Sequence, residues 1–257
     1  MQVVILAGGY GTRLTEETSV RPKPMVEIGG RPILWHIMKL YSHYGMNEFI
    51  VCCGYKAHVI KEYFASYRLH ASDVTIDLRT DQVTLHPADL EPWHVTLLDT
   101  GETTLTGGRL KRAASHLRPE TLCLTYGDCL TDVNLDRLVE SHRASGALAT
   151  MTAVQPPGRF GVLTLDQDEP TISSFSEKPP GDGGWINGGF FVLEPGALAY
   201  VAGDETAWER EPLEALANEG KLGAYRHDGY WQNMDSLRDK MILEEQWDSG
   251  SPPWKVW

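Results

Sequence analysis

The N-terminal residues have the pattern of a phosphate-binding loop. Three glycines (Gly8, Gly9 and Gly11) follow a short apolar run and precede Arg13. Glycine has no Cβ atom, so backbone N–H groups in such a loop can approach an anion closely. Arginine can donate two parallel hydrogen bonds to phosphate oxygens, and Lys23, between two prolines, offers a second fixed positive charge. The spacing favours a phosphorylated ligand, and a structural turn with solvated basic residues is the alternative.

Two familiar phosphate-binding motifs fit this loop badly. A P-loop requires a Lys-Ser or Lys-Thr pair, and neither follows Gly11. The dinucleotide-binding motif requires a third glycine where this chain has Leu14. The spacing therefore disfavours a nicotinamide-dependent oxidoreductase.

Two aspartates far apart in the chain are candidate metal ligands. Asp128 follows an apolar run in "CLTYGDCLTDV", and Asp235 precedes the last predicted helix in "GYWQNMDSLRD". Taken alone, Asp235 is better explained by the preference for acidic residues in the first turn of a helix. Asp132 lies near the start of the next helix, and we expect a capping or dipole role for it.

The elements that must position these residues alternate between strand and helix in the first half. Such alternation predicts right-handed crossovers and a largely parallel sheet. Ligands bind beyond the carboxyl ends of strands in these sheets, where the glycine loop and Asp128 are expected. The predicted strands are Val3–Leu6, Phe49–Cys53, Val74–Leu78, Val95–Leu98 and Leu122–Tyr126, and the predicted helices are Pro32–Tyr44, Ala57–Tyr67, Leu110–Leu117 and Asn134–Ala144.

The second half is richer in strands, and no linker separates it from the first. We therefore expect a single α/β domain over residues 1–257, with a Rossmann-like, mixed but mostly parallel sheet and flanking helices. Asn134 is a predicted N-cap, and Gly146 a predicted helix end. The remaining predicted strands are Ala149–Val154, Phe160–Leu165, Thr171–Phe175, Ile186–Leu193 and Gly223–His227, and the helices are Glu211–Asn218 and Ser236–Trp247.

Composition narrows the class of partner and the compartment. The net charge of −12 argues against nucleic acid or an anionic membrane as a partner. No apolar stretch is long enough for a membrane span, and the N-terminus lacks the basic region of a signal peptide. The four cysteines lack metal-binding spacing, which favours reduced thiols in the cytoplasm. The closing "SPPWKVW" carries two tryptophans that need cover, which favours a homo-oligomer.

The combined motifs resemble a known family. The segments "LAGGYGTRL" and "RPKPMVEIGGRPIL" resemble the signature of the sugar-1-phosphate nucleotidylyltransferases. Segments such as "EPWHVTLLDTG", "PPGRFGVL", "INGGFFVL" and "WEREPLEALA" resemble the cytidylyltransferases of this family nearly end to end. The resemblance implies a glycosyltransferase-A-like nucleotidyltransferase fold and Mg²⁺-dependent transfer from CTP to α-D-glucose 1-phosphate. The products would be CDP-glucose and pyrophosphate.

The resemblance also implies roles for individual residues. Asp128 and Asp235 match the Mg²⁺ ligands and, with Arg13 and Lys23, the catalytic set. It implies a nucleotide-binding half at 1–147, a sugar-phosphate-binding half at 148–235, and a C-terminal helix and tail at 236–257. The implied sugar-phosphate ligands are Glu177, Lys178 and Asn187, and the implied nucleotide contacts are Leu6, Ala7, Gly8, Gly9, Tyr10, Gly11, Thr12, Arg13, Lys23, Thr104, Arg109 and Asp128.

Several alternatives stay open on the residues alone. A solvated charge pair explains Glu177 and Lys178, and Tyr126 and Trp231 suit a pocket wall or the core equally. Cys129 stands where the subfamily usually has glycine, which leaves the exact sugar open. UTP, dTTP or another sugar 1-phosphate would need the same chemistry. An inactive sugar-nucleotide-binding regulator is disfavoured because all four catalytic positions are intact.

Overall fold

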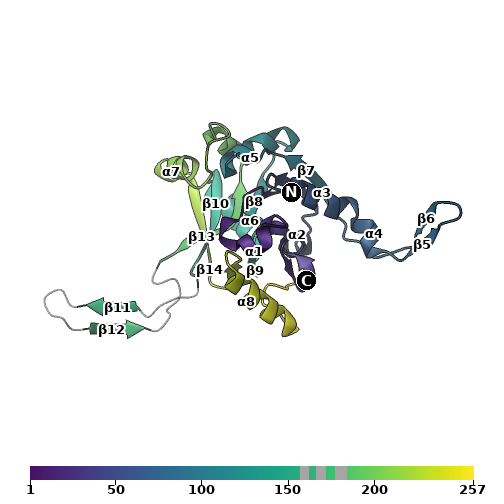
Figure 1. The fold of residues 1–257 in the computed structure, drawn as a ribbon. Helices are drawn as coiled ribbons and strands as arrows, with labels where there is room; N and C mark the ends of the chain where they lie inside the picture. Colours follow the sequence, from purple (N-terminus) through teal and green to yellow (C-terminus); the bar gives the residue numbers. More distant parts are fainter. Residues whose placement is uncertain (157–161, 166–171, 177–183) are drawn as a thin grey trace.

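The computed structural model describes residues 1–156, 162–165, 172–176 and 184–257, and its centre is a seven-stranded sheet (Figure 1). The strands lie in the order β14-β10-β13-β8-β1-β4-β7. Their bounds are β1 Gln2–Ala7, β4 Glu48–Cys53, β7 His94–Asp99, β8 Leu122–Tyr126, β10 Ala149–Val154, β13 Ile186–Leu193 and β14 Leu222–His227.

The strand directions confirm the predicted mixed, mostly parallel sheet. β1 is parallel to both β4 and β8, β4 is parallel to β7, and β10 is parallel to β14. Strand β13 runs antiparallel to its neighbours β8 and β10. The carboxyl ends of β1, β4, β7 and β8 therefore meet at one edge, where the glycine loop begins.

Side chains alternate across the sheet into two cores. Val3 and Ile5 of β1 belong to one buried cluster, and Val4 and Leu6 belong to the other. Cys52 and Cys53 likewise enter opposite clusters, as expected of neighbours on a strand. Burial on both faces explains why these strands read as unbroken apolar runs.

The helices cover the sheet and extend one arm away from it (Figure 1). Asn134 caps α6 by accepting a hydrogen bond from the Arg137 backbone, and Gly146 ends it at a φ of 66°, so both predictions are confirmed. The α-helices are α1 Thr15–Thr18, α2 Ile33–His43, α3 Ala57–Ala65, α4 Tyr67–Ala71, α5 Thr106–Ala113, α6 Leu135–Ser145, α7 Glu211–Asn218 and α8 Leu237–Asp248. The 3-10 helices include η1 Thr12–Leu14, η2 Lys23–Met25, η3 Ala114–His116 and η5 Pro195–Tyr200.

Two predicted elements differ from the structure. Helix α5 starts at Thr106 rather than at residue 110. The sequence pattern missed its first turn because Gly107 and Gly108 are poor helix formers. The strand predicted at Val74–Leu78 exists as β5 Val74–Asp77 but lies outside the central sheet. It pairs with β6 Gln82–Leu85 in a hairpin at the end of the α3–α4 arm (Figure 1).

Three further two-stranded pairs complete the described fold. One of them, β9 Cys129–Thr131 with β15 Trp231–Asn233, joins the segments that carry Asp128 and Asp235. The others are β2 Glu27–Ile28 with β3 Arg31–Pro32, and β11 Val162–Leu165 with β12 Ile172–Ser176. Among the described residues, no helix is both long enough and apolar enough to cross a membrane.

The C-terminal tail is covered by its own chain. Trp254 is 1% exposed and stacks against Trp247 of α8, while its Nε1 donates to His36 Nδ1 of α2. Trp257 packs against Trp35, which also lies on α2. The tail folds back onto α2 and α8, so these tryptophans are covered within the chain and do not themselves favour a second subunit.

Candidate active site

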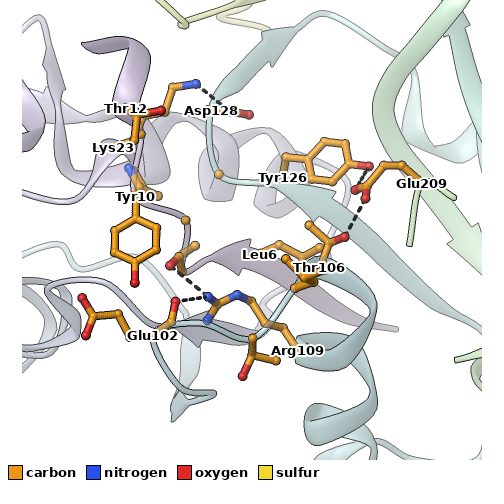
Figure 2. A pocket seen from close by; sticks show the side chains of 18 of the residues that line it. Leu6, Tyr10, Thr12, Lys23, Glu102, Thr106, Arg109, Tyr126, Asp128 and Glu209 are labelled. Carbon is orange, nitrogen blue, oxygen red and sulfur yellow. Dashed lines mark hydrogen bonds and ion pairs between the residues drawn. The ribbon is translucent and has the colours of Figure 1, made fainter. Parts of the chain in front are cut away.

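A cleft of about 510 Å³ opens beyond the carboxyl ends of the central strands. Figure 2 shows side chains from the glycine loop, η2, β8 and α5 converging on it. Glu177 and Lys178 lie outside the described residues. Every other predicted site residue lines this cleft, namely Leu6, Ala7, Gly8, Gly9, Tyr10, Gly11, Thr12, Arg13, Lys23, Thr104, Arg109, Asp128, Asn187 and Asp235.

The glycine loop owes its shape to two of its glycines. Gly11 has a φ of 64°, the left-handed region that side chains other than glycine rarely adopt, and its carbonyl accepts from the Leu14 backbone to start η1. A Cβ on Gly8 would lie 2.0 Å from Arg109 Nη1. A Cβ on Gly9 would meet nothing within 4 Å, so the loop is open toward the cleft at that point.

Lys23 lies between the two predicted metal ligands. Its Nζ is 2.7 Å from Asp128 Oδ2 and 2.5 Å from Asp235 Oδ1. The lysine is only 8% exposed, and burial by itself would lower its pKa. The attraction of Asp128 and hydrogen bonds to both carboxylates outweigh burial and raise the pKa of Lys23 above its ordinary value. The lysine is therefore a fixed positive charge at neutral pH.

The second carboxylate oxygen of Asp235 has two further partners. Its Oδ2 accepts from Asn233 Nδ2 at 2.7 Å and pairs with Arg13 Nη1 at 3.0 Å. Burial would raise the pKa of Asp235, but the hydrogen bond from Lys23, with the charges of Lys23 and Arg13, lowers it below its ordinary value. Arg13 itself is 76% exposed, so its guanidinium can also reach a ligand in the cleft.

The β9–β15 pair explains how two aspartates so far apart in the chain meet. Cys129 pairs with Asn233, and the Met234 backbone N–H donates to the Asp128 carbonyl at 2.9 Å. Asp235 then lies just before Ser236, the N-cap of α8, and the acidic residue in the first turn of that helix is Asp239. Neither short strand has an apolar pattern that sequence alone could have identified.

The two carboxylates suit a hard divalent cation. One ammonium contacts an oxygen from each, so the two oxygens converge on a single cation position. Within the described residues no cluster of three or more histidine, cysteine or acidic side chains could hold a metal ion. Mg²⁺ is commonly held by one or two carboxylates together with substrate phosphates, and this donor set fits that pattern.

The buried Arg109 side chain joins the ends of β1, β4 and β7, and we call its hydrogen bonds to them the Arg109 clamp. The residue is 4% exposed, and its guanidinium donates to the carbonyl of Gly8 after β1 and of Cys53 at the end of β4. It also donates to the Thr100 hydroxyl and to the Gly101 and Glu102 carbonyls after β7. Sequence reasoning placed Arg109 at the nucleotide, and the structure adds that it holds the floor of the cleft together.

Three neighbouring residues escaped the sequence prediction or were left undecided. Tyr126 lines the cleft and donates to Glu209 Oε1 at 2.6 Å, and Thr106 donates to Glu209 Oε2 at 2.6 Å (Figure 2). Asn187 Nδ2 lies 3.4 Å from the Tyr126 hydroxyl. Glu209 had no chemical signal in sequence, since an acidic residue before a helix is ordinarily an exposed charge.

Two undecided residues have structural roles. Asp132, for which a capping or dipole role was expected, pairs with His227 at 3.0 Å, and the N-cap of α6 is the predicted Asn134. Cys129 is buried at the start of β9, with its thiol 3.4 Å from Asp128 Oδ1. Burial and the neighbouring Asp128 charge raise the pKa of the Cys129 thiol well above its ordinary value.

The fold and the cleft define a class of protein: an α/β protein whose cleft beyond β1, beside two carboxylates, suits a phosphorylated ligand. The nucleotidyl transferase family model matches residues 2–247. A glucose-1-phosphate cytidylyltransferase from Salmonella typhi is 55% identical, and a probable one from Bacillus subtilis is 45% identical, each over the full length of both chains. The structure of a UDP-glucose pyrophosphorylase complexed with UDP-glucose shares the fold, with a TM-score of 0.68, 15% identity, and coverage of 97% of this chain and 98% of that one.

The chain therefore belongs to the nucleotidyl transferase family and, within it, to the group of the glucose-1-phosphate cytidylyltransferases.

Proposed function

We propose that the protein transfers the cytidylyl group of CTP to α-D-glucose 1-phosphate in the presence of Mg²⁺, giving CDP-glucose and pyrophosphate. The observation that carries the proposal is the contact of Lys23 with both Asp128 and Asp235 beside the glycine loop. The full-length similarity to relatives named for this activity supports the choice of nucleotide and sugar.

The reaction needs positioning and charge neutralisation more than proton transfer. An oxygen of the sugar phosphate, already anionic at neutral pH, attacks the α-phosphorus of CTP. A new P–O bond forms there, the bond to the oxygen bridging to the β-phosphate breaks, and pyrophosphate leaves with that electron pair. Because no proton has to leave the nucleophile, alignment and preorganised positive charge supply the catalysis.

Different residues of the cleft bind the triphosphate, the metal and the sugar phosphate. The backbone N–H groups of residues 8–12 and the Arg13 guanidinium hold the triphosphate, and Lys23 stabilises charge that develops during transfer. When bound at Asp128 and Asp235, Mg²⁺ supplies further positive charge to the phosphates. Thr104 and Arg109 shape the nucleotide end, and Asn187, with Glu177 and Lys178, holds the sugar phosphate.

Phosphorus NMR of the complete reaction tests the proposal. With CTP, glucose 1-phosphate and MgCl₂, we expect the resonances of both substrates to be replaced by those of a pyrophosphate diester and free pyrophosphate. Wild-type protein that leaves both substrates unchanged under these conditions would refute the proposed activity.

We further propose that the protein is a cytoplasmic homo-oligomer. The four cysteines are free and buried, which suits a reducing compartment. The β5–β6 arm carries exposed apolar side chains, including Ile76, Leu78 at 89% exposure and Val83, and these support association through the arm. Sedimentation of the purified protein tests this, and a monomer at micromolar concentration would contradict it.

A further inference from the structure

Glu209 is a carboxylate held in one orientation at the wall of the cleft. Tyr126 donates to its Oε1, and Thr106 donates to its Oε2, both at 2.6 Å (Figure 2). The Thr106 hydroxyl accepts in turn from the Trp208 backbone N–H at 2.9 Å, which fixes the direction of its own hydrogen. Donors from β8 and from the start of α5 thus restrain the carboxylate before any ligand binds.

The partners of Glu209 differ from those of Asp128 and Asp235, which both contact Lys23. Glu209 has no cationic partner in the part of the chain that the structure describes, and it is exposed to the cleft. A carboxylate accepts hydrogen bonds and donates none, and each of its oxygens can accept from a second donor. Such a group repels phosphate and attracts hydroxyl groups, so it suits a neutral, hydroxyl-rich part of a ligand.

The order of strands places Tyr126, one of the two partners of Glu209, on the side of β1 away from β4 and β7. The other partner, Thr106, lies on α5 together with Arg109. The sequence β13-β8-β1-β4-β7 puts the glycine loop after β1, and the Arg109 clamp ties that loop to the ends of β4 and β7. Tyr126 ends β8 and Asn187 lies near the start of β13, on the other side of β1. Asn187 approaches Tyr126 at 3.4 Å, so Glu209 belongs to the same corner as the predicted sugar ligand.

We propose that Glu209 is a specificity-determining residue that accepts a hydrogen bond from a hexose hydroxyl of the sugar 1-phosphate. Tyr126 and Thr106 are positioning residues that orient its carboxylate. This inference rests on the proposed function, since it assigns a contact to the sugar of that reaction. Because Tyr126 and Thr106 each occupy one acceptor position of the carboxylate and fix its orientation, the remaining acceptor positions point in defined directions, which makes the contact selective.

Steady-state kinetics of Glu209→Gln against both substrates test the assignment. We expect the KM for glucose 1-phosphate to rise about tenfold or more, as for loss of a hydrogen bond to a charged group, while the KM for CTP stays within about twofold. Thermal unfolding of this isosteric variant should match wild type. Glu214→Gln, an exposed glutamate on α7, is the matched control and should behave as wild type.

Deoxyglucose 1-phosphates, each lacking one hydroxyl, identify the contact. On one analogue, the kcat/KM of wild type should fall, relative to glucose 1-phosphate, by the factor that Glu209→Gln costs on glucose 1-phosphate itself. The variant should show no further loss of kcat/KM on that analogue. Tyr126→Phe should raise the sugar KM by a smaller factor with kcat preserved, as expected of a positioning residue.

Two results would overturn the assignment. One is a rise in the KM for CTP alone, which would place Glu209 at the ribose. The other is equal discrimination among the analogues by wild type and variant. The kinetic test of Glu209 can use any nucleotide and sugar 1-phosphate that wild type turns over. If wild type prefers a pair other than CTP and glucose 1-phosphate, the proposed function is refuted, and the test of Glu209 still stands.

Discussion

Lys23 Nζ lies 2.7 Å from Asp128 Oδ2, although the two residues are 105 positions apart in the chain. The lysine contacts Asp235 as well, so one buried ammonium offsets two carboxylates that would otherwise repel each other. At ~4 Å and an effective dielectric constant of ~20, such repulsion is about 4 kcal/mol. The catalytic centre therefore has positive charge in place before substrates bind.

Replacing Lys23 with methionine should affect both turnover and the response to metal. We expect kcat to fall about 100-fold or more, as when a preorganised charge or donor is removed from a transition state. Without the ammonium, Asp128 and Asp235 should bind Mg²⁺ more tightly, so MgCl₂ should raise the melting temperature of Lys23→Met more than that of wild type. Differential scanning fluorimetry measures this, with Lys61→Met, an exposed lysine on α3, as control. Equal Mg²⁺ responses in Lys23→Met and wild type would contradict the proposal that Lys23 and Mg²⁺ compete for the same two carboxylates.

Metal removal should stop the reaction reversibly. We expect a chelator to abolish pyrophosphate release and added Mg²⁺ to restore it. Asp128→Asn should require a much higher Mg²⁺ concentration for half-maximal rate, because an amide is a weaker ligand for a hard cation than a carboxylate. Asp132→Asn is the matched control, since Asp132 lies four residues on and pairs with His227. An unchanged Mg²⁺ requirement in Asp128→Asn would remove this residue from the metal site.

Two of the three loop glycines, Gly8 and Gly9, should tolerate alanine differently. A Cβ at Gly8 meets Arg109 Nη1 at 2.0 Å, whereas a Cβ at Gly9 meets nothing within 4 Å. We expect Gly8→Ala to lose about 1–3 kcal/mol of unfolding free energy, as in overpacked interiors, and to raise the KM for CTP. Gly9→Ala should keep the stability of wild type. Urea denaturation compares them, and equal stability of both variants would show that Arg109 moves aside freely.

His36 should make stability fall in acid. Burial lowers the pKa of His36 from 6.5 to about 4 in the folded chain, despite its hydrogen bond to the Ile28 carbonyl. The unfolded chain therefore binds a proton at this residue first, and stability is lost as the pH falls from 6.5 toward 4. The full effect is ~3 kcal/mol, and it should be absent from His36→Asn. Urea unfolding at several pH values measures it, and parallel pH profiles for the two proteins would contradict the assignment.

Sequence patterns predicted the central sheet and the cleft well because each rests on a local signal. Runs such as Val3–Leu6 are apolar on both faces, and the glycine loop follows at the carboxyl end of that strand. Asn134 and Gly146 likewise carry their capping chemistry in their own side chains or backbone. These features need no knowledge of the rest of the chain.

The parts that sequence missed depend on contacts between distant segments. Strands β9 and β15 are three residues each and become strands only by pairing with each other. The clamp of Arg109 on three loops is invisible in "TGGRLKR", where an arginine among basic residues reads as exposed. Glu209 acquires its role from Tyr126 and Thr106, more than 80 positions away.

A substrate panel measures which nucleotide and which sugar 1-phosphate the protein prefers. Purified protein with MgCl₂ is assayed for pyrophosphate release with CTP, UTP, dTTP and GTP, each against glucose 1-phosphate and several other sugar 1-phosphates. The account predicts the highest kcat/KM for CTP with glucose 1-phosphate and no release without the sugar phosphate. Absence of CTP-dependent turnover with glucose 1-phosphate, or an equal rate from an Asp128→Asn variant, would contradict it.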